Sequence, residues 1–409
     1  MAATSLLSQI SINSRAVSRL RAGHVWVYES DLAGSNKPEP GALVQVADPR
    51  GKILGTALYS SSSQIALRLL TRNPLSSPIH SASIQSEDEL LHLTRKRMAE
   101  AIAYRSLVVQ DSNAYRVVFS EADRLPGLMI DRYNDIYTLQ VLTQGWDQPE
   151  RKRAVLHSLC DLAGAENIVE RVDDRIRELE QLPALASSVV HGRRNTTIFS
   201  MNGVQFHYDA TGGQKTGAFL DQRENYAAAA RYAHGEALDV CTYQGGFALH
   251  LARVCEKVTA LDISREALEV AEQNEKLNAA DNKNEIEWME ANAFDLLKDY
   301  AAAGRQYDTV VLDPPAFAKS KRNLEPALRG YKELNLRALK MLRPGGILVT
   351  CSCSFHISET EFLEVLNTAA QDVHRSVRIV EKRGQAKDHP ILLGVPETHY
   401  LKCLICMAS

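Results

Sequence analysis

The sequence lacks the long apolar segments of membrane and secreted proteins. Its 409 residues contain no run of about 18 apolar residues, so we expect no membrane span. The first residues contain no basic segment followed by an apolar core, so we expect no secretory signal. These absences predict a cytoplasmic protein.

Cysteine is scarce as well. The seven cysteines are odd in number and scattered, which argues against a disulfide framework and favours reduced thiols. Cys403 and Cys406 form a Cys-x-x-Cys pair, but no second cysteine pair and no nearby histidine pair completes a zinc site. We therefore predict two buried thiols on a terminal strand and no metal centre.

The chain has no strong excess of either charge, since its formal net charge is −3. This balance is not that of a typical nucleic-acid-binding domain, which carries a basic patch. Local basic clusters are present, and each alone is typical of a solvated face: Arg15, Arg19 and Arg21; Arg193, Arg194 and Lys215; Lys319, Lys321, Arg322, Arg329 and Lys332. Only their convergence on one surface would indicate a polyanion site.

The length favours two or three domains. Residues 1–72 read as short strands separated by turns, such as the one at 48–51, and predict a small β-rich barrel. Residues 73–195 read as a separate α+β unit. Its helix over 87–108 is predicted to bury one stripe of residues, namely Leu90, Leu91, Thr94, Met98, Ala101 and Ile102. Residues 196–409 alternate strands with helices, which predicts an α/β fold with a parallel, doubly wound sheet.

Four apolar, β-prone runs in the last region stop at a polar or Gly/Pro cluster: 238–247, 260–264, 310–317 and 349–354. Buried parallel strands have this appearance when each ends at a functional loop. In an open α/β sheet, ligands bind outside the carboxyl ends of the strands. The four ends therefore outline one predicted site.

The first two strand ends suggest a nucleoside ligand. Gly245 and Gly246 would let the backbone approach a ligand closely, and a helix N-terminus there favours an anion. The spacing is not Gly-x-Gly-x-x-Gly, so the dinucleotide fingerprint is absent. Asp262 could hold ribose hydroxyls, and Asp239 precedes the glycine loop. Each aspartate could instead be a helix cap or turn former.

The later strand ends carry other polar groups. Asn292 could bond an adenine edge or serve as a turn residue. After Asp313, two prolines fix the backbone, so a rigid carboxylate and exposed carbonyls could grip a flat, amide-like base; the alternative is a structural proline turn. Cys351 and Cys353 would point to the same face of a strand. We predict that Cys351 is buried and structural, and that Cys353, beyond the strand body, is a nucleophile.

These motifs closely resemble the family of the S-adenosylmethionine-dependent ribosomal RNA large subunit methyltransferase I, a 23S rRNA 5-methylcytosine methyltransferase. The resemblance covers essentially the whole chain and rests on six segments: 19–28, 121–128, 130–133, 214–223, 387–390 and 400–402. It implies an N-terminal PUA RNA-binding domain (1–72), a central α+β domain (73–195) and a class I, Rossmann-like methyltransferase domain (196–409).

The resemblance also implies roles for individual residues. Cys353 would be the nucleophile, and Asp313 would bind and polarise the cytosine. The residues expected around S-adenosylmethionine are Asp239, Tyr243, Gly245, Gly246, Phe247, Asp262, Ser264, Asn292 and Asp313. Those expected around the RNA substrate are Lys215, Gln222, Arg223, Pro314, Pro315 and Phe317.

Two departures from the family pattern touch the target-base pocket. Ala316 stands where the family often has lysine, and Phe355 stands where glycine is common. They leave the methylated nucleotide open. Competing readings are a guanine-N7 methyltransferase on the same sheet, which needs no cysteine, a non-catalytic RNA-binding protein, and a nicotinamide oxidoreductase, which the missing fingerprint disfavours. The sequence leaves a homodimer open and does not identify the group that removes the C5 proton.

Overall fold

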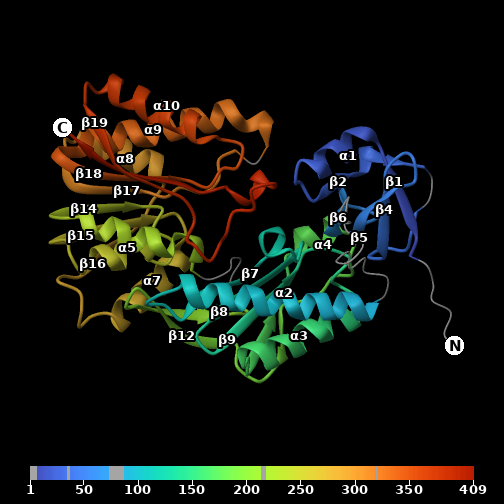
Figure 1. Ribbon diagram of the computed structural model, residues 1–409. Coiled ribbons are helices and arrows are strands. Elements are labelled where there is room, and N and C mark those ends of the chain that lie inside the picture. The colour runs from blue at the N-terminus through green and yellow to red at the C-terminus, as the bar shows by residue number, and fades with distance from the viewer. Residues whose placement is uncertain (1–6, 35–36, 73–86, 213–217, 319) are drawn as a thin grey trace.

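The computed structural model describes residues 7–34, 37–72, 87–212, 218–318 and 320–409. These residues form three parts, and the first described strand, β1, lies on the opposite side of the molecule from the C-terminal end (Figure 1). The N-terminal part contains helix α1, the central part lies along the long helix α2, and the C-terminal part is built on the largest sheet.

The N-terminal part is a six-stranded sheet in the order β2-β6-β5-β4-β1-β3, with one α-helix. Its elements are β1 (Gln9–Ile12), α1 (Ser14–Arg21), β2 (Trp26–Tyr28), β3 (Leu32–Ala33), β4 (Leu43–Ala47), β5 (Ile53–Tyr59) and β6 (Ile65–Arg72). The predicted turn at 48–51 joins β4 to β5, where the Asp48 carboxylate accepts hydrogen bonds from the amides of Arg50 and Lys52. Ile12, Val27 and Val44 belong to a separate hydrophobic core.

The central part is a five-stranded sheet in the order β11-β10-β9-β8-β7, with helices α2 and α3 packed against each other. Its elements are α2 (Glu87–Val108), β7 (Ala114–Phe119), β8 (Leu128–Tyr133), β9 (Ile136–Val141), α3 (Pro149–Ala163), β10 (Asn167–Glu170), α4 (Asp174–Leu179) and β11 (Ser188–His191).

The buried face of α2 differs from the predicted stripe. Leu91 and Ile102 are only half-buried, whereas Arg97 and Arg105 are 6% and 1% exposed. The reason is that the helix lies at junctions between the parts of the molecule. Arg105 pairs with Asp123 at 2.6 Å, and Arg97 donates to backbone carbonyls.

A β-hairpin connects the central part to the C-terminal part. It consists of β12 (Thr196–Met201) and β13 (Val204–Asp209). The ring of Tyr208 stacks on Tyr133 of β8 with a centroid distance of 3.8 Å. Phe199 and Phe206 of the hairpin belong to the same hydrophobic core as Val349 of the C-terminal sheet, so the hairpin fixes one part on the other.

The C-terminal sheet has seven strands in the order β16-β15-β14-β17-β18-β20-β19. They are β14 (Glu236–Val240), β15 (Lys257–Asp262), β16 (Ile286–Glu290), β17 (Tyr307–Leu312), β18 (Leu342–Ser352), β19 (Val377–Arg383) and β20 (Lys402–Ala408). The prediction of a parallel sheet is confirmed for β14 to β18. It is wrong for β20, which runs antiparallel to β18 and β19. The connection from β19 to β20 contains no α-helix that crosses the sheet, so the chain returns in the opposite direction.

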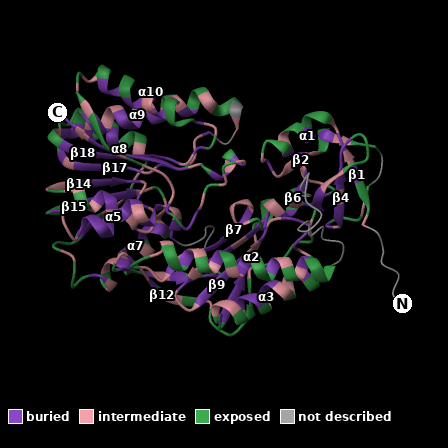
Figure 2. Cartoon of the chain, in the orientation of Figure 1, coloured by how far each residue is buried: buried purple, intermediate pink, exposed green. Residues whose placement is uncertain are grey.

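Helices cover both faces of this sheet (Figure 1). They are α5 (Arg223–Tyr232), α6 (Gly246–Leu251), α7 (Arg265–Leu277), α8 (Ala293–Ala302), α9 (Leu324–Met341) and α10 (Glu359–Asp372). Val311 packs with Tyr226 on one face, and its neighbour Val310 packs with Tyr331 on the other. Figure 2 shows the strands as buried between the helices, which explains their continuous apolar runs.

Neither a membrane span nor a metal cluster is found in the part of the chain that the structure describes. No helix there is long and apolar enough to cross a bilayer. No group of three or more His, Cys, Asp or Glu side chains there is arranged to hold a metal ion.

Candidate active site

The predicted strand ends meet at one edge of the sheet. Strand order reverses between β14 and β17, because β15 lies on one side of β14 and β17 on the other. Such a switch point is where open α/β sheets bind ligands. A pocket there is lined by Phe219, Tyr243, Phe247 and Asp313, among others.

Asp239 is fully buried beneath the loop that follows β14. Its Oδ2 accepts hydrogen bonds from the Thr242 hydroxyl at 2.6 Å and the Ala248 amide at 2.9 Å. The Ala248 amide in the first turn of α6 is therefore satisfied by a side chain of the protein, and the binding of a ligand anion at this helix end remains a prediction. The other oxygen, Oδ1, is buried without a hydrogen-bond partner among the described residues. Burial raises the pKa of Asp239 to about 7.

Gly245 and Gly246 are required by packing. Gly245 has a φ of +86°, and a Cβ there would lie 2.9 Å from the Trp288 ring. A Cβ on Gly246 would lie 2.5 Å from the ring of Tyr226. Tyr243 between the strand and these glycines also has a positive φ, +52°. The loop is therefore tightly constrained beside the pocket.

Asp262 is held at the end of β15 by two backbone amides. Its carboxylate accepts from Tyr243 N at 2.9 Å and Ser264 N at 3.0 Å. Ser264 Oγ accepts from Ala267 N and so caps α7. Asn292 Oδ1 accepts from Phe294 N and caps α8. Both residues thus cap helices in this structure, whereas the sequence had offered a turn residue as the alternative role of Asn292.

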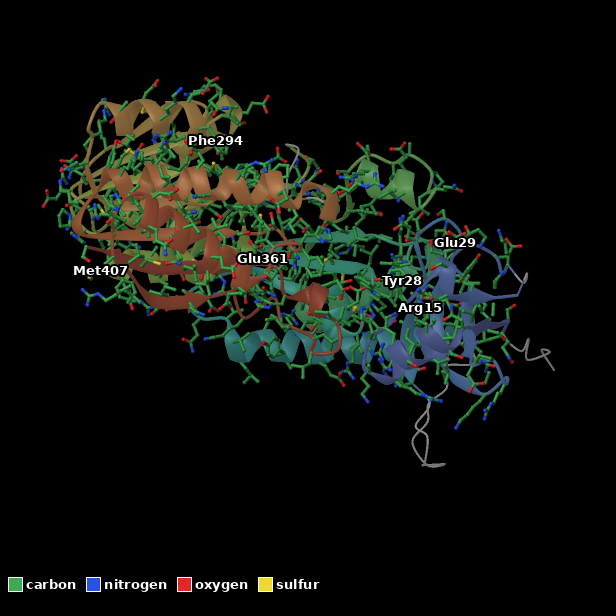
Figure 3. The ribbon with its side chains drawn as sticks, turned by 90° about the horizontal axis from the view of Figure 1, so that it is seen from above. Arg15, Tyr28, Glu29, Phe294, Glu361 and Met407 are labelled. Atoms are coloured by element: carbon green, nitrogen blue, oxygen red, sulfur yellow. The ribbon has the colours of Figure 1, made fainter. Side chains whose placement is uncertain are left out.

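Sequence reasoning missed two apolar side chains at these strand ends. Ile263 follows Asp262 and is 69% exposed, and Phe294 is 38% exposed at the start of α8. Figure 3 labels Phe294 in the C-terminal part, and its ring lies 5.9 Å from that of Phe317. The available signal was a large apolar residue next to a polar strand end. Such exposed apolar surface beside a carboxylate suits the flat ring and the ribose of a nucleoside.

Asp313 is fixed at the end of β17. Its amide donates to Val240 O at 3.2 Å, and its Oδ1 accepts from Gln222 Nε2 at 2.9 Å. Asn225 in turn donates to Gln222 Oε1 at 2.7 Å and orients that amide. Burial, followed by the charges of Asp221 and Asp239, raises the pKa of Asp313 to about 8. The carboxyl group is therefore mainly protonated at neutral pH.

Two of the residues expected around the substrate are buried and bind other side chains of the protein. Gln222 is 3% exposed and holds Asp313, while Arg223 is 2% exposed and pairs with Asp388 at 2.8 Å. Both therefore act on other side chains in this structure. Lys215 lies outside the described residues.

The loop after β17 brings the remaining expected substrate residues to the site. Pro314 is buried and Pro315 is exposed. Phe317 is half-buried, with its ring centroid 4.7 Å from that of Tyr331. The Pro314 carbonyl accepts a 3.9 Å contact from the Cys353 thiol, so this loop and the predicted nucleophile are in direct contact.

The two cysteines occupy different environments, as predicted. Cys351 is fully buried near the end of β18, directly opposite Cys403 of β20. Burial and the Cys403 thiol raise the pKa of Cys351 well above that of an ordinary thiol. Cys353 lies just beyond β18 and is half-buried. Burial, followed by the charges of Asp313 and Asp221, raises the pKa of Cys353 to about 12, so its thiol is protonated in this state. Cys406 is also buried on β20, which confirms the reading of the Cys-x-x-Cys pair as buried thiols.

Two further residues of the site were not predicted. Lys402 is 6% exposed, and its Nζ donates to the carbonyls of Ser354 at 2.7 Å, Ile357 at 2.8 Å and Tyr400 at 2.9 Å. Burial lowers the pKa of Lys402 to about 8, and its charge lowers the pKa of Cys353. Asp221 accepts from the Tyr400 hydroxyl at 2.7 Å and raises the pKa of both Asp313 and Cys353. Both residues lie in segments that carry the family resemblance, and this was the only feature of the sequence that could have assigned them to the site.

The residues present fit a nucleoside that carries an amino-acid tail. Asp262 offers an oriented carboxylate for hydroxyl groups, with Ile263 exposed next to it. The unpaired Oδ1 of Asp239 offers a buried acceptor for a cationic or hydroxyl donor. These groups would hold the ribose, the base and the polar tail of S-adenosylmethionine.

Comparison with known proteins places the chain in a class. Residues 133–403 match the model of the S-adenosylmethionine-dependent methyltransferases, and residues 10–72 match that of a PUA-like domain. The chain is therefore an S-adenosylmethionine-dependent methyltransferase with a PUA-like N-terminal domain, and S-adenosylmethionine is its cofactor.

Curated relatives narrow the class to one family. The ribosomal RNA large subunit methyltransferase I of Photobacterium profundum is 36% identical over 395 residues, 95% of this chain and 96% of the relative. That of Tolumonas auensis is 36% identical over 393 residues, 94% of this chain and 95% of the relative. The chain belongs to the ribosomal RNA large subunit methyltransferase I family.

Solved structures share the fold over the whole chain. A methyltransferase complexed with S-adenosylhomocysteine has a TM-score of 0.80 at 17% identity and covers 98% of this chain and 100% of its own. A methyltransferase from Streptococcus mutans has a TM-score of 0.79 at 16% identity and covers the same shares of the two chains. The family-model match begins at residue 133, inside the predicted central domain, so the domain limits 73–195 and 196–409 remain predictions.

Proposed function

We propose that this enzyme transfers a methyl group to C5 of a cytosine in 23S ribosomal RNA through a covalent bond between Cys353 and C6. The observation that carries the proposal is the half-buried Cys353 thiol beyond β18, in contact with the Asp313-Pro314 loop. A methyl transfer to an already nucleophilic atom would not need a thiol at this position. The names of the relatives support ribosomal RNA as the substrate, and the PUA-like domain supports RNA binding.

The residue types match the difficulty of the reaction. Cytosine C5 is a poor nucleophile, and addition of a thiolate to C6 makes C5 enamine-like. The bound cofactor supplies the electrophilic methyl group. A bond forms between Sγ and C6, C5 takes the methyl group, the C5 proton leaves to a base, and the Sγ–C6 bond then breaks.

Asp313 is suited to assist the addition. Because its pKa is about 8, its carboxyl group is mainly neutral at pH 7 and can donate a hydrogen bond or proton to cytosine N3. This withdraws electrons from C6 as the thiolate attacks. A protonated Asp313 also carries no negative charge against the thiolate. Gln222 and Asn225 keep the carboxyl group in one orientation.

A second candidate is methylation of guanine N7 in the same RNA. One observation favours it: the pKa of Cys353 is about 12, so little thiolate exists before substrate binds. Guanine N7 has a lone pair in the plane of the base and needs no covalent activation. The S-adenosylmethionine requirement would be the same for both reactions.

The test is to incubate the protein with total RNA that includes unmodified 23S rRNA and with methyl-labelled S-adenosylmethionine, to separate the RNAs, and to identify the labelled nucleoside by mass spectrometry. We expect 5-methylcytidine. Labelled 7-methylguanosine would overturn the C5 proposal and support the second candidate. Label in another RNA, with none in 23S rRNA, would overturn the proposed substrate.

A further inference from the structure

A cavity lies where the N-terminal part meets the central part. It is lined by Leu70 and Arg72 of β6, Arg97 of α2, and Glu121 and Arg124 of the loop after β7. Its volume is about 310 Å³. A water molecule occupies about 30 Å³ of liquid, so the cavity has room for a phosphate group and several waters. The segment 121–128 carried part of the family resemblance but has no role in the site described above.

Arg97 is a buried cation without a carboxylate. It is 6% exposed, and it donates to Arg124 O at 2.6 Å and Leu70 O at 2.7 Å. Its Nε is buried without a hydrogen-bond partner among the described residues. Backbone carbonyls orient a guanidinium but do not neutralise it. Glu100, which pairs with Arg124, acts on Arg97 only through its charge.

Arg72 is a second cation of this kind, at the exposed rim of the cavity. It donates to the carbonyls of Leu20, Gly23 and His24. Neither Arg72 nor Arg97 forms a salt bridge in the described part of the chain. The stretches outside that part contain no Asp or Glu, so no carboxylate there can compensate them.

Several other arginines of these two parts form salt bridges. Arg15 and Arg19 share the buried Asp31, and Arg116 pairs with Asp131 at 2.7 Å. Figure 3 places Arg15 on the N-terminal part. In the predicted basic cluster at 15–21, one carboxylate is thus shared by two arginines.

Glu121 lines the cavity and the charge of Glu100 acts on Arg97, and both carboxylates are held by other side chains. The Glu121 carboxylate accepts from Trp26 Nε1 at 2.8 Å and from the Ser120 hydroxyl, and Glu100 pairs with Arg124. Burial, followed by the charge of Arg124, lowers the pKa of Arg97 to about 10, although the charge of Glu100 raises it. An anion in the cavity would offset the cost of burying the Arg97 charge.

We propose that this cavity binds a phosphate group, and that in the working enzyme the phosphate belongs to the RNA backbone. Guanidinium groups match phosphate oxygens in charge and in planar, multiple hydrogen bonding. A phosphate held between the PUA-like domain and the rest of the enzyme would set the register of the RNA without reading its sequence. The RNA source rests on the proposed function, whereas the phosphate site does not.

The main variant is Arg72→Gln, because Arg72 is exposed and lies at the rim of the cavity. The affinity for a 23S rRNA fragment is measured over a range of salt concentrations. The slope of log affinity against log salt is negative. Loss of one phosphate contact should make it less steep by about 0.7–0.9 and weaken binding at low salt. Arg124→Gln should act in the same direction. The matched control is Arg95→Gln. Arg95 lies on α2, as Arg97 does, but it is 47% exposed and pairs with Asp161.

A second measurement tests the site without RNA. Inorganic phosphate should raise the melting temperature of the wild type, because a ligand that binds only the folded state stabilises it. The shift should be smaller in Arg72→Gln and Arg97→Met and unchanged in Arg95→Gln. If Arg97→Met does not fold, Arg72→Gln still decides.

The outcomes separate the two proposals. Wild-type slopes in both Arg72→Gln and Arg124→Gln, with no phosphate-dependent shift in melting temperature, would overturn the phosphate site. A phosphate shift with unchanged RNA slopes would overturn RNA as the source and assign the cavity to free phosphate. A wild-type protein that neither binds nor methylates RNA would contradict the proposed function, and the phosphate measurement would then judge the cavity alone.

Discussion

At the scale of single residues, the predominant protonation state of the pair Asp313 and Cys353 is not the one that the reaction needs. The reaction needs a neutral Asp313 and a Cys353 thiolate, but Asp313 has the lower pKa, about 8 against about 12. The pair loses its first proton mainly from Asp313. Once one proton is lost, the form with a neutral Asp313 and a Cys353 thiolate makes up a small fraction of the pair, and this fraction does not change with pH.

This order of pKa values predicts the pH dependence. The kcat/KM for RNA should rise about tenfold per pH unit below about pH 8 and level off above it, since kcat/KM reports the free enzyme. In Asp313→Asn the break near pH 8 should disappear, and the rate should continue to rise with pH. Lys402 also has a pKa of about 8, so Lys402→Arg, which keeps its charge at all these pH values, should retain the break. A flat profile in the wild type would contradict the thiolate mechanism.

Asp262 should contribute directly to cofactor affinity. Its carboxylate is already oriented by two backbone amides, so little freedom is lost when hydroxyl groups bind. Asp262→Ala should weaken S-adenosylmethionine binding by about 1–3 kcal/mol, as measured by calorimetry. Asp281→Ala, which removes a 56% exposed carboxylate, is the control and should bind normally. Unchanged affinity in Asp262→Ala would remove this residue from the site.

At the scale of elements, the segment after β18 is held by one buried ammonium. The three donors of Lys402 bind three carbonyls of residues 354, 357 and 400. The hydroxyl of Ser354 accepts from Ala318 N at 3.2 Å and contacts Tyr331 at 3.1 Å. The segment that carries Cys353 is thereby fixed against the segment that carries Asp313.

Lys402→Met should loosen this segment and remove the charge that favours the thiolate. We expect the methylation rate to fall by at least about tenfold, cofactor affinity to remain near that of the wild type, and alkylation of Cys353 by iodoacetamide to slow at a given pH. Lys402→Arg should recover part of the rate. Normal alkylation and methylation in Lys402→Met would show that the ammonium has no role in positioning Cys353.

The elements themselves were largely predictable, because their signals are local. The helices at 87–108 and 359–372 follow from apolar periodicity, and the second begins with a capping box between Ser358 and Glu361. The burial of Arg97 and Lys402 was not predictable in this way. Their partners are carbonyls up to 48 residues away in the sequence, and no local pattern marks a carbonyl as an acceptor.

At the scale of the whole molecule, Asp388 joins the central and C-terminal parts. Its carboxylate accepts from Arg223 at 2.8 Å and from the amide of Arg116, and its carbonyl accepts from Arg105. Burial alone would raise the pKa of Asp388, but the charges of His389 and Arg223 hold it well below its usual range. These partners are 165 to 283 residues away in the sequence, so this node could not be predicted locally.

Asp388→Asn should destabilise the protein by about 3–5 kcal/mol, because it leaves the buried Arg223 without the counter-charge of Asp388. Denaturant unfolding checks this, with Asp161→Asn, which removes half of an exposed pair, as a control that should cost less than about 1 kcal/mol. Because the pKa of Asp388 is depressed on folding, its contribution should be complete above about pH 5 and be lost on acidification. Wild-type stability in Asp388→Asn would contradict this account of the domain junction.

The arrangement of the site was predicted because strand ends of a parallel sheet must meet at one edge. Asp239, Asp262, Asp313 and Cys353 all lie there, as expected. What the strand pattern could not show is which polar groups face a ligand and which serve the protein. Asp239 caps α6 through one oxygen, an assignment that depends on three-dimensional packing.

The central claim is that Cys353, not Cys351, forms a covalent bond to the target cytosine. The most direct measurement uses 23S rRNA with 5-fluorocytosine, together with S-adenosylmethionine, because fluorine at C5 cannot leave as a proton does and the adduct is trapped. We predict a covalent RNA–protein band on a denaturing gel for the wild type and for Cys351→Ala, and none for Cys353→Ala, although that variant still binds cofactor. An adduct in Cys353→Ala, or a wild type that methylates the RNA without forming one, would contradict the account.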